Sequence, residues 1–172
     1  MHRTLRRAGV TATILALVLS LSACALGDSD QADNTGNGGN AAVGTIPAVT
    51  DNGADAEPGI ARPDGAAPTQ LLSQDLTVGT GAEATADSVV TVHYTGISWS
   101  TGETFDSSWP SGQPIEFPLS NLIQGWKEGI PGMKVGGRRV LVIPPALAYG
   151  AAPGHPLEKE TLVFVIDLKG VK

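Results

Sequence analysis

Hydrophobic and polar residues alternate with a period of two over much of the C-terminal part of this chain. The alternation is strongest in three segments rich in β-branched residues, at positions 89–94, 139–142 and 162–168. Weaker matches occur in three further segments, at positions 70–78, 104–107 and 115–117. Because successive side chains of a β-strand point to opposite faces, this period predicts half-buried strands. We therefore expect a sheet of five to six strands.

One segment, residues 121–130, has the period of a helix instead. Leu122 and Trp126 lie four residues apart and therefore share one face. Ser120 or Asn121 can cap the start of this helix, and a Pro-Gly pair follows its end. A single helix cannot cover both faces of a parallel sheet, and most connections are too short for crossovers. The prediction is an α+β domain in which an antiparallel sheet curls around one short α-helix.

The first residues of the chain have the pattern of an export signal. Three arginines precede an uncharged apolar run from Ala8 to Leu21. At about 14 residues this run is shorter than the ~20 that a membrane-spanning helix needs. We expect residues 1–23 to be a signal peptide, and Arg6-Arg7 leaves open whether export is general or of the twin-arginine type.

The tetrapeptide Leu21-Ser22-Ala23-Cys24 closes this run and resembles a bacterial lipobox, in which the cysteine thiol receives a diacylglyceryl group. Cys24 is the only cysteine in the chain. We expect a lipid anchor there, with the protein at the outer face of the cytoplasmic membrane or facing the periplasm. The alternatives are an ordinary secretory signal followed by a chance cysteine, or a free thiol.

Residues 25–68 have a different composition, rich in Ala, Gly, Asn and Asp. They contain seven acidic residues against Arg62 alone, a net charge of −6, and all eight aromatic residues of the chain lie between positions 94 and 164. Such a segment offers little apolar surface to offset the entropy of ordering it. We expect residues 24–68 to be a lipidated cysteine with a disordered acidic linker, and residues 69–172 to be the folded domain.

The composition also excludes several classes of function. One cysteine allows no internal disulfide, and one cysteine with three histidines allows no Cys/His zinc site. A net charge of −6 argues against nucleic acid as a partner. Motifs for a nucleophile elbow, a phosphate loop or a zinc protease are incomplete or absent. Any catalysis would therefore need no metal and no cofactor.

Rotation about the peptide bond before proline is a reaction with that profile. Its barrier of ~18–20 kcal/mol arises from amide resonance, so the uncatalysed exchange takes tens to hundreds of seconds. An enzyme has to stabilise a twisted amide. An apolar pocket with aromatic walls and a few hydrogen-bond donors can do so, and roughly 7 kcal/mol of stabilisation would give about 10⁵-fold acceleration.

Five strings of residues support this reaction more specifically. They are Val92-His93-Tyr94-Thr95-Gly96, Thr104-Phe105-Asp106-Ser107-Ser108, Ile123-Gln124-Gly125-Trp126-Lys127-Glu128-Gly129, Ala148-Tyr149-Gly150 and Thr161-Leu162-Val163-Phe164. In order and approximate spacing they resemble the FKBP class of peptidyl-prolyl cis-trans isomerases, over about residues 70–170. The resemblance implies a twisted antiparallel sheet wrapped over a short helix, with a proline-binding pocket between them.

The resemblance also implies roles for individual residues. The catalytic set would be Tyr94, Phe105, Asp106, Trp126, Tyr149 and Phe164. Trp126 would form the floor of the pocket, Tyr149 would present its hydroxyl from a loop, and Asp106 would orient polar groups at the rim. The backbone amide of Ile123 would receive a substrate carbonyl, with Leu122 beside it. Without the resemblance, the same aromatic residues would be interpreted as ordinary core residues.

This sequence departs from the family pattern at several positions. Ile115 stands where many relatives have an aromatic wall residue, and Ser111 stands where an arginine often pairs with the aspartate. His155 in the loop is expected to be a rim contact or a bystander. Trp109 is extra, and with Pro110 it would add a lip to the pocket. These departures concern the substrate preference and the affinity for macrolide ligands more than the fold.

The sequence therefore predicts a monomeric isomerase that accelerates rotation of X-Pro bonds in exported polypeptides and so assists their folding. The alternative is a catalytically weak peptide-binding module that acts as a chaperone or adaptor. The complete aromatic set favours catalysis, whereas Ile115 and Ser111 favour the alternative.

Overall fold

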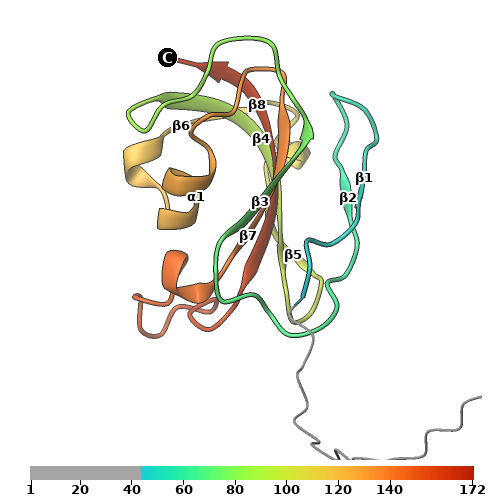
Figure 1. Cartoon of the computed structure of the whole chain (residues 1–172), viewed down its shortest axis with the longest axis vertical. Coiled ribbons are helices and arrows are strands. Elements are labelled where there is room, and N and C mark those ends of the chain that lie inside the picture. Colours follow the sequence, from blue (N-terminus) through green and yellow to red (C-terminus); the bar gives the residue numbers. More distant parts are fainter. Residues whose placement is uncertain (1–43) are drawn as a thin grey trace, which may run out of the picture. The chain divides into compact units, whose positions relative to one another are not determined.

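Six strands form one antiparallel sheet in residues 44–172, which are the residues that the computed structural model describes (Figure 1). They are β3 (Leu72–Thr77), β4 (Val89–Ser98), β5 (Thr104–Ser107), β6 (Ile115–Pro118), β7 (Arg138–Ile143) and β8 (Leu162–Val171). The strand order is β3-β7-β8-β4-β5, and β6 pairs with the first half of β4. The prediction of an α+β fold with an antiparallel sheet is confirmed.

One α-helix, α1 (Gln124–Gly129), lies on one side of this sheet (Figure 1). Three 3₁₀ turns complete the helical elements: η1 (Trp109–Ser111), η2 (Leu119–Asn121) and η3 (Pro145–Leu147). Within residues 44–172 no helix has the length and hydrophobicity to cross a membrane.

The helix is shorter than the predicted segment 121–130. Leu122 and Ile123 have extended backbones, with ψ of 171° and 152°, and separate the η2 turn from α1. Ile123 is the N-cap residue and no side chain caps the helix, so the expectation that Ser120 or Asn121 would do so is wrong. Because these two residues are extended, Leu122 is not part of the helix.

The main hydrophobic core lies between the sheet and α1. Its fully buried strand residues are Val90, Val92, Leu141, Ile143, Leu162, Ile166 and Leu168. The helix approaches these strands through its glycines, since a Cβ at Gly125 would lie 2.4 Å from Cγ2 of Ile143. This close approach fixes the position of Trp126, the next residue of the helix.

A second hydrophobic cluster lies on the opposite face of the sheet. It contains Ile97, Trp99, Val140, Val142, Val163 and Val165, all at most 6% exposed. A two-stranded hairpin of β1 (Val49–Thr50) and β2 (Gly59–Ile60) covers it, and this hairpin lies on the side of the sheet away from α1 (Figure 1). Ile46, Val49 and Ile60 supply the apolar contacts of the hairpin segment.

This hairpin corrects the predicted domain boundary. Residues 44–68 were expected to belong to a disordered linker, but they pack against the domain, and the folded unit therefore begins before residue 69. The physical reason is the outer face of the sheet. Strands β7 and β8 carry apolar side chains on both faces, which is the pattern of strands covered on both sides. The predicted signal peptide, Cys24 and the linker up to residue 43 lie outside the described residues.

Candidate active site

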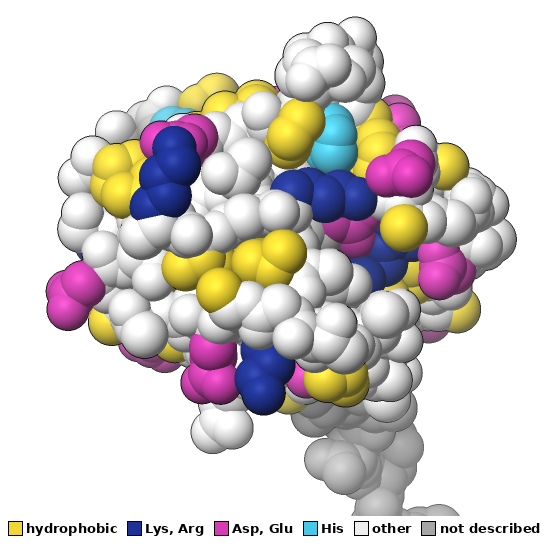
Figure 2. Space-filling view, turned by 90° about the horizontal axis from the view of Figure 1, so that it is seen from above, with side chains coloured by type: hydrophobic (Ala, Val, Ile, Leu, Met, Phe, Trp, Pro, Cys, Tyr) yellow, Lys and Arg dark blue, Asp and Glu magenta, His cyan; other side chains and the backbone are white. Residues whose placement is uncertain are grey.

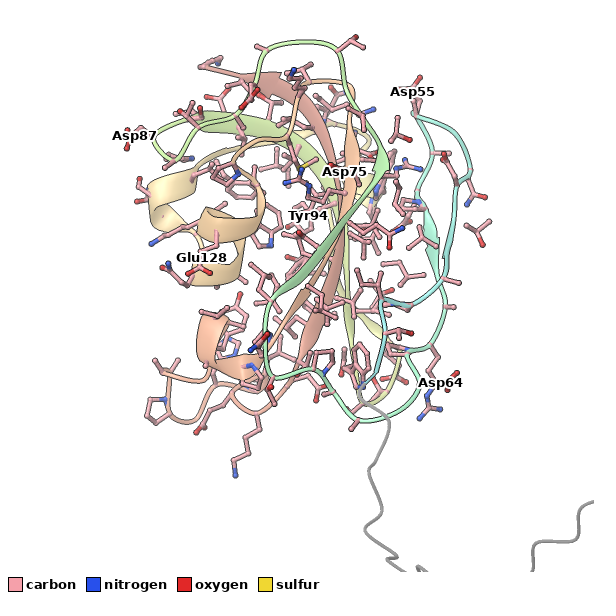
Figure 3. The ribbon with its side chains drawn as sticks, in the orientation of Figure 1. Asp55, Asp64, Asp75, Asp87, Tyr94 and Glu128 are labelled. Atoms are coloured by element: carbon pink, nitrogen blue, oxygen red, sulfur yellow. The ribbon has the colours of Figure 1, made fainter. Side chains whose placement is uncertain are left out.

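A cavity of about 330 Å³ opens between the sheet and α1. The residues that line it are Tyr94, Phe105, Asp106, Phe117, Asn121, Leu122, Ile123, Trp126, Tyr149 and Phe164. Figure 3 shows Tyr94 pointing from the sheet toward the helix side. The fold thus brings all six residues of the predicted catalytic set to one cavity, together with Leu122 and Ile123.

Aromatic rings form the floor and walls of this cavity. Trp126 is 4% exposed and meets three rings edge-on, with centroid distances of 5.4 Å to Tyr94, 6.3 Å to Phe117 and 5.3 Å to Phe164. Phe105 meets Phe164 at 5.5 Å and 89°. Such edge-to-face packing holds each ring in a defined orientation. The result is an apolar surface made of rings in defined orientations.

A β-bulge positions the polar side of the cavity. Asp106 is paired with Gly96 and Thr104 with Ile97, so Phe105 is an extra residue on β5 without a partner on β4. A bulge lets consecutive side chains point to the same face. Phe105 and Asp106 therefore both line the cavity although they are neighbours in a strand.

Gly96 makes room for this arrangement. A Cβ at this position would lie 2.7 Å from Cζ of Phe105 and 2.8 Å from Cε1 of Phe164. Real Cβ atoms do not approach other carbon atoms so closely, and any side chain would displace one of the two rings. The glycine after Tyr94 and Thr95 is therefore a steric requirement of the site.

Tyr94 orients the carboxylate of Asp106. The Tyr94 hydroxyl donates a hydrogen bond of 2.8 Å to Oδ2 of Asp106. Burial raises the pKa of Tyr94 above its usual value, and the bond to Asp106 raises it further, so the phenol stays protonated. Within residues 44–172, no arginine pairs with Asp106. The hydroxyl of Ser111, at the expected arginine position, lies 2.6 Å from the carbonyl oxygen of Ser108 and 2.9 Å from that of Gln113, so its one proton is donated within this turn.

Two hydrogen-bond donors border the cavity. The N–H of Ile123 makes no hydrogen bond to any residue of the described part of the chain, and it precedes the first turn of α1. Tyr149 lines the cavity from the loop after η3. These two donors can bind the carbonyl groups of a peptide in the cavity.

Comparison with known proteins agrees with this geometry. Residues 81–169 match the family described as FKBP-type peptidyl-prolyl cis-trans isomerase. The chain is 58% identical over 113 residues to a "Probable FK506-binding protein" of Corynebacterium glutamicum, covering 65% of this chain and 96% of that protein. The chain belongs to the FKBP family of peptidyl-prolyl cis-trans isomerases. The predicted resemblance and the enzyme class are confirmed.

Other FKBP relatives extend this result. An FK506-binding protein of Streptomyces anulatus is 47% identical over 120 residues, covering 67% of this chain and 97% of the relative. The crystal structure of FkpA from Escherichia coli is similar with a TM-score of 0.55 and 42% identity, over 60% of this chain and 49% of that chain. An isomerase structure from Pseudomonas syringae gives a TM-score of 0.53 and 38% identity, over 59% of this chain and 75% of that chain.

Some predicted FKBP site residues lie elsewhere. Ile115 packs against the main core and does not line the cavity, where Phe117 takes the wall position two residues later on β6. Phe117 was missed because the family pattern places the aromatic wall residue of this strand at position 115. Asn121, at the cavity mouth, was missed because it was assigned to the helix.

His155 and Trp109 support neighbouring residues. The His155 ring stacks on Tyr149 at a centroid distance of 4.0 Å and an angle of 11°, and its Nδ1 accepts the N–H of Leu157. His155 thus lies beside Tyr149 and does not line the cavity. Trp109 forms no lip on the cavity. It stacks on His93, at 4.1 Å and 12°.

Proposed function

We propose that this FKBP-type isomerase acts on X-Pro bonds of polypeptides that have crossed the cytoplasmic membrane, and that a lipid on Cys24 holds it at that membrane. The sequence of residues 1–24 supports the location, with its arginines, apolar run and single cysteine after small residues. The two acyl chains of a diacylglyceryl group at this residue would make the attachment durable.

The cavity supports the chemistry of this proposal. A twisted X-Pro amide has lost its resonance, so it is less polar across the C–N bond and has a more basic nitrogen. Rings of Trp126, Phe105 and Phe164 enclose the proline and exclude water, which would otherwise stabilise the planar amide. Because these rings are held by edge-to-face packing, the surface does not have to reorganise in the transition state.

The polar groups orient the substrate in this proposal. The Ile123 N–H receives the carbonyl after the proline, and the Tyr149 hydroxyl contacts the peptide from the loop above. The Asp106 carboxylate, held by Tyr94, orients polar groups of the peptide at the rim of the cavity. The same cavity would take a macrolide of the FK506 class, as the names of the two bacterial relatives indicate for those proteins.

The isomerase assay tests the site. The full chain should accelerate cis-trans exchange of a proline peptide, measured by NMR exchange. Tyr149→Ala should lower kcat/KM at least ~10-fold, because a group that orients the substrate is lost. Val78→Ala is the control, since Val78 is 74% exposed and lies outside the cavity. No acceleration by the wild-type chain at micromolar concentration would favour the peptide-binding alternative.

The location is tested separately. In bacterial cells, Cys24→Ala should release the protein from the membrane fraction or leave it unprocessed, while Cys24→Ala protein should keep the isomerase activity of the wild type. Processing and membrane association unchanged by Cys24→Ala would refute the anchor and leave the isomerase assignment intact.

A further inference from the structure

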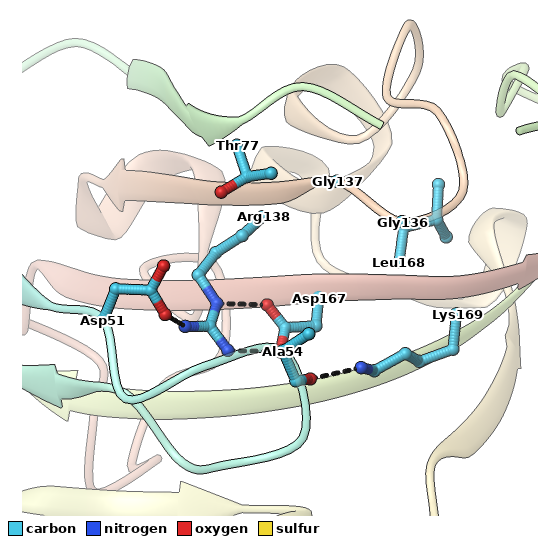
Figure 4. A pocket seen from close by; sticks show the side chains of 9 residues that line it. All are labelled: Asp51, Ala54, Thr77, Gly136, Gly137, Arg138, Asp167, Leu168 and Lys169. Carbon is cyan, nitrogen blue, oxygen red and sulfur yellow. Dashed lines mark hydrogen bonds and ion pairs between the residues drawn. The ribbon is translucent and has the colours of Figure 1, made fainter. Parts of the chain in front are cut away.

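The hairpin segment, residues 44–68, is attached to the outer face of the sheet by a buried arginine. The Arg138 side chain is 4% exposed and donates to both carboxylate oxygens of Asp167 on the neighbouring strand. It also donates to the carboxylate of Asp51 (Figure 4). Two further acceptors are the carbonyl oxygens of Gly53 and Ala56. The turn of the hairpin is therefore held to the sheet by one guanidinium.

The hollow beside this arginine is a structural feature and no ligand site. It measures about 240 Å³, its Arg138 pairs with Asp51 and Asp167, and its Lys169 donates a hydrogen bond to the Ala54 carbonyl (Figure 4). Viewed from the end of the molecule that carries this turn, basic and acidic side chains lie side by side with no large patch of one sign (Figure 2). Nothing on this surface calls for an external ion.

A second attachment joins the hairpin segment to the strand that carries the site. Oε1 of Glu57 accepts one hydrogen bond from the Thr95 hydroxyl and one from the Ser107 hydroxyl, both of 2.8 Å. Thr95 on β4 and Ser107 on β5 are direct cross-strand partners. One carboxylate oxygen therefore bridges the β4–β5 pair from the outer face.

The backbone of Glu57 is fixed before it makes this bridge. Pro58 follows it and is buried, and a residue before proline is restricted to extended conformations. The Asn52 side-chain amide also donates to the Glu57 carbonyl, at 2.8 Å. The carboxylate is thus presented by a constrained backbone, although Glu57 is exposed to solvent.

Strand β5 has little else to hold it. Within the described residues it is four residues long, lies at the edge of the sheet, pairs only with β4, and has a bulge in that pairing. An edge strand with a bulge is the part of a sheet most easily displaced. Phe105 and Asp106 of the candidate site both lie on it, and Asp106 is the residue directly before Ser107.

We propose that Glu57 is a positioning residue of the isomerase: its bridge to Thr95 and Ser107 holds β5 so that Phe105 and Asp106 keep their places in the cavity. The proposal rests on the assignment of these two residues to the active site. It extends the functional unit to the segment before residue 69, on the face of the sheet opposite the substrate.

Variants of the full chain test this proposal. Glu57→Ala removes the oxygen that accepts both bonds, and kcat/KM should fall roughly 3- to 10-fold. Glu57→Gln should keep most of the activity, because its amide oxygen still accepts both hydroxyl bonds. Asp64→Ala is the matched control, since this exposed acid of the same segment makes no hydrogen bond within the described residues and lies at the outer edge of the molecule (Figure 3).

Hydrogen exchange separates positioning from overall stability. In Glu57→Ala, the amides of Asp106 and Ser107 should exchange faster, whereas those in the middle of β8 should not change. Equal acceleration in β5 and β8 would overturn the proposal, as would a kcat/KM equal to that of Asp64→Ala. Should Glu57→Ala fail to fold, Ser107→Ala provides the same two readouts from the other partner. The wild type is measured in the same assay. If the wild type is active and Glu57→Ala is unaffected, the Glu57 proposal fails while the isomerase assignment stands.

Discussion

The hydroxyl of Tyr94 and the carboxylate of Asp106 are joined by a hydrogen bond of 2.8 Å at the edge of the aromatic cavity. Tyr94 is 8% exposed, whereas Asp106 lies on an exposed part of β5. The buried phenol therefore determines where the exposed carboxylate points. Within residues 44–172, the tyrosine is the only hydrogen-bonding partner of this carboxylate.

Tyr94→Phe should consequently lower both the activity and the stability at neutral pH, and it should make the stability less sensitive to alkaline pH. Loss of one hydrogen bond to a charged group costs roughly 1.5–3 kcal/mol when the acceptor stays in place, and kcat/KM should fall about tenfold or more. The raised pKa of Tyr94 means that the unfolded chain releases this proton first as the pH rises above about 10. Its contribution to stability is present below that pH and is lost above it.

Urea denaturation between pH 8 and pH 11 checks this second expectation. The wild type should lose unfolding free energy over that range, and Tyr94→Phe should lose less of it. Equal slopes for the two proteins would show that the tyrosine proton does not contribute.

Gly96→Ala should displace the aromatic rings that form the wall of the cavity. The new methyl group would lie within 2.8 Å of both phenylalanine rings, which are packed against each other and cannot both move away. Overpacking of this kind costs about 1–3 kcal/mol of stability, and displacement of Phe105 should lower kcat/KM at least ~10-fold.

Gly59→Ala in β2 is the control for this substitution. Its Cβ would meet Thr50 Cβ at an ordinary distance of 3.5 Å. The two variants can be compared by thermal unfolding and by the exchange assay. A Gly96→Ala protein as active as Gly59→Ala would contradict the close approach of the rings.

His93 should make stability depend on pH on the acid side. It stacks on Trp109, and its Nδ1 lies 3.0 Å from the buried hydroxyl of Ser108, which also accepts the N–H of Tyr94. Burial lowers the pKa of His93 below 6.5, and Lys169 lowers it further, against the opposite effects of Asp167 and Asp55. Folding is then favoured above pH 6.5 and weakened below it, because the unfolded chain binds the proton more readily.

The measurement is the unfolding free energy at pH 7.5 and pH 5.5. His93→Gln should lose less stability than the wild type between these values. The same loss in both proteins would assign the acid dependence to other groups.

Truncation should distinguish the two possible domain boundaries. A chain that begins at residue 44 should unfold like the full chain. One that begins at residue 69 should be less stable by more than about 2 kcal/mol, because Val140, Val142 and Val163 lose their apolar cover. Arg138 also loses three of its acceptors in that shorter chain. Equal urea midpoints for the two truncated chains would support the boundary at residue 69.

Much of the fold follows from local pattern in the sequence. The strands β4 and β8 lie where the β-branched segments at 89–94 and 162–168 predict strands. The prediction that these strands are half-buried is wrong, because their side chains are mostly buried on both faces of the sheet. The helix was placed correctly around Trp126, but its start was not. Leu122 has a helical spacing in the sequence, yet it is extended in the structure, because it lines the cavity instead of the helix face.

The hairpin segment could not be predicted from composition alone. Its apolar residues Ile46, Val49 and Ile60 are few. They stabilise the segment only because they pack against the apolar outer face of the sheet. A sequence signal for that surface existed in the uninterrupted apolar run of β8, which a one-sided sheet does not need. The bulge at Phe105 could not be predicted from the sequence either, because the register between two strands depends on how they pair in the folded sheet.

The docking of residues 44–68 also changes the geometry of the proposed anchor. If all of residues 25–68 were a free tether, the domain could stand up to about 150 Å from Cys24, at 3.4 Å per residue. With the tether ending at Gly44, residues 25–43 allow at most about 65 Å. Under the proposed anchoring, the isomerase would therefore be confined to a thin layer above the membrane, and its local concentration there would be higher. It would meet polypeptides as they emerge from export rather than after they have diffused away.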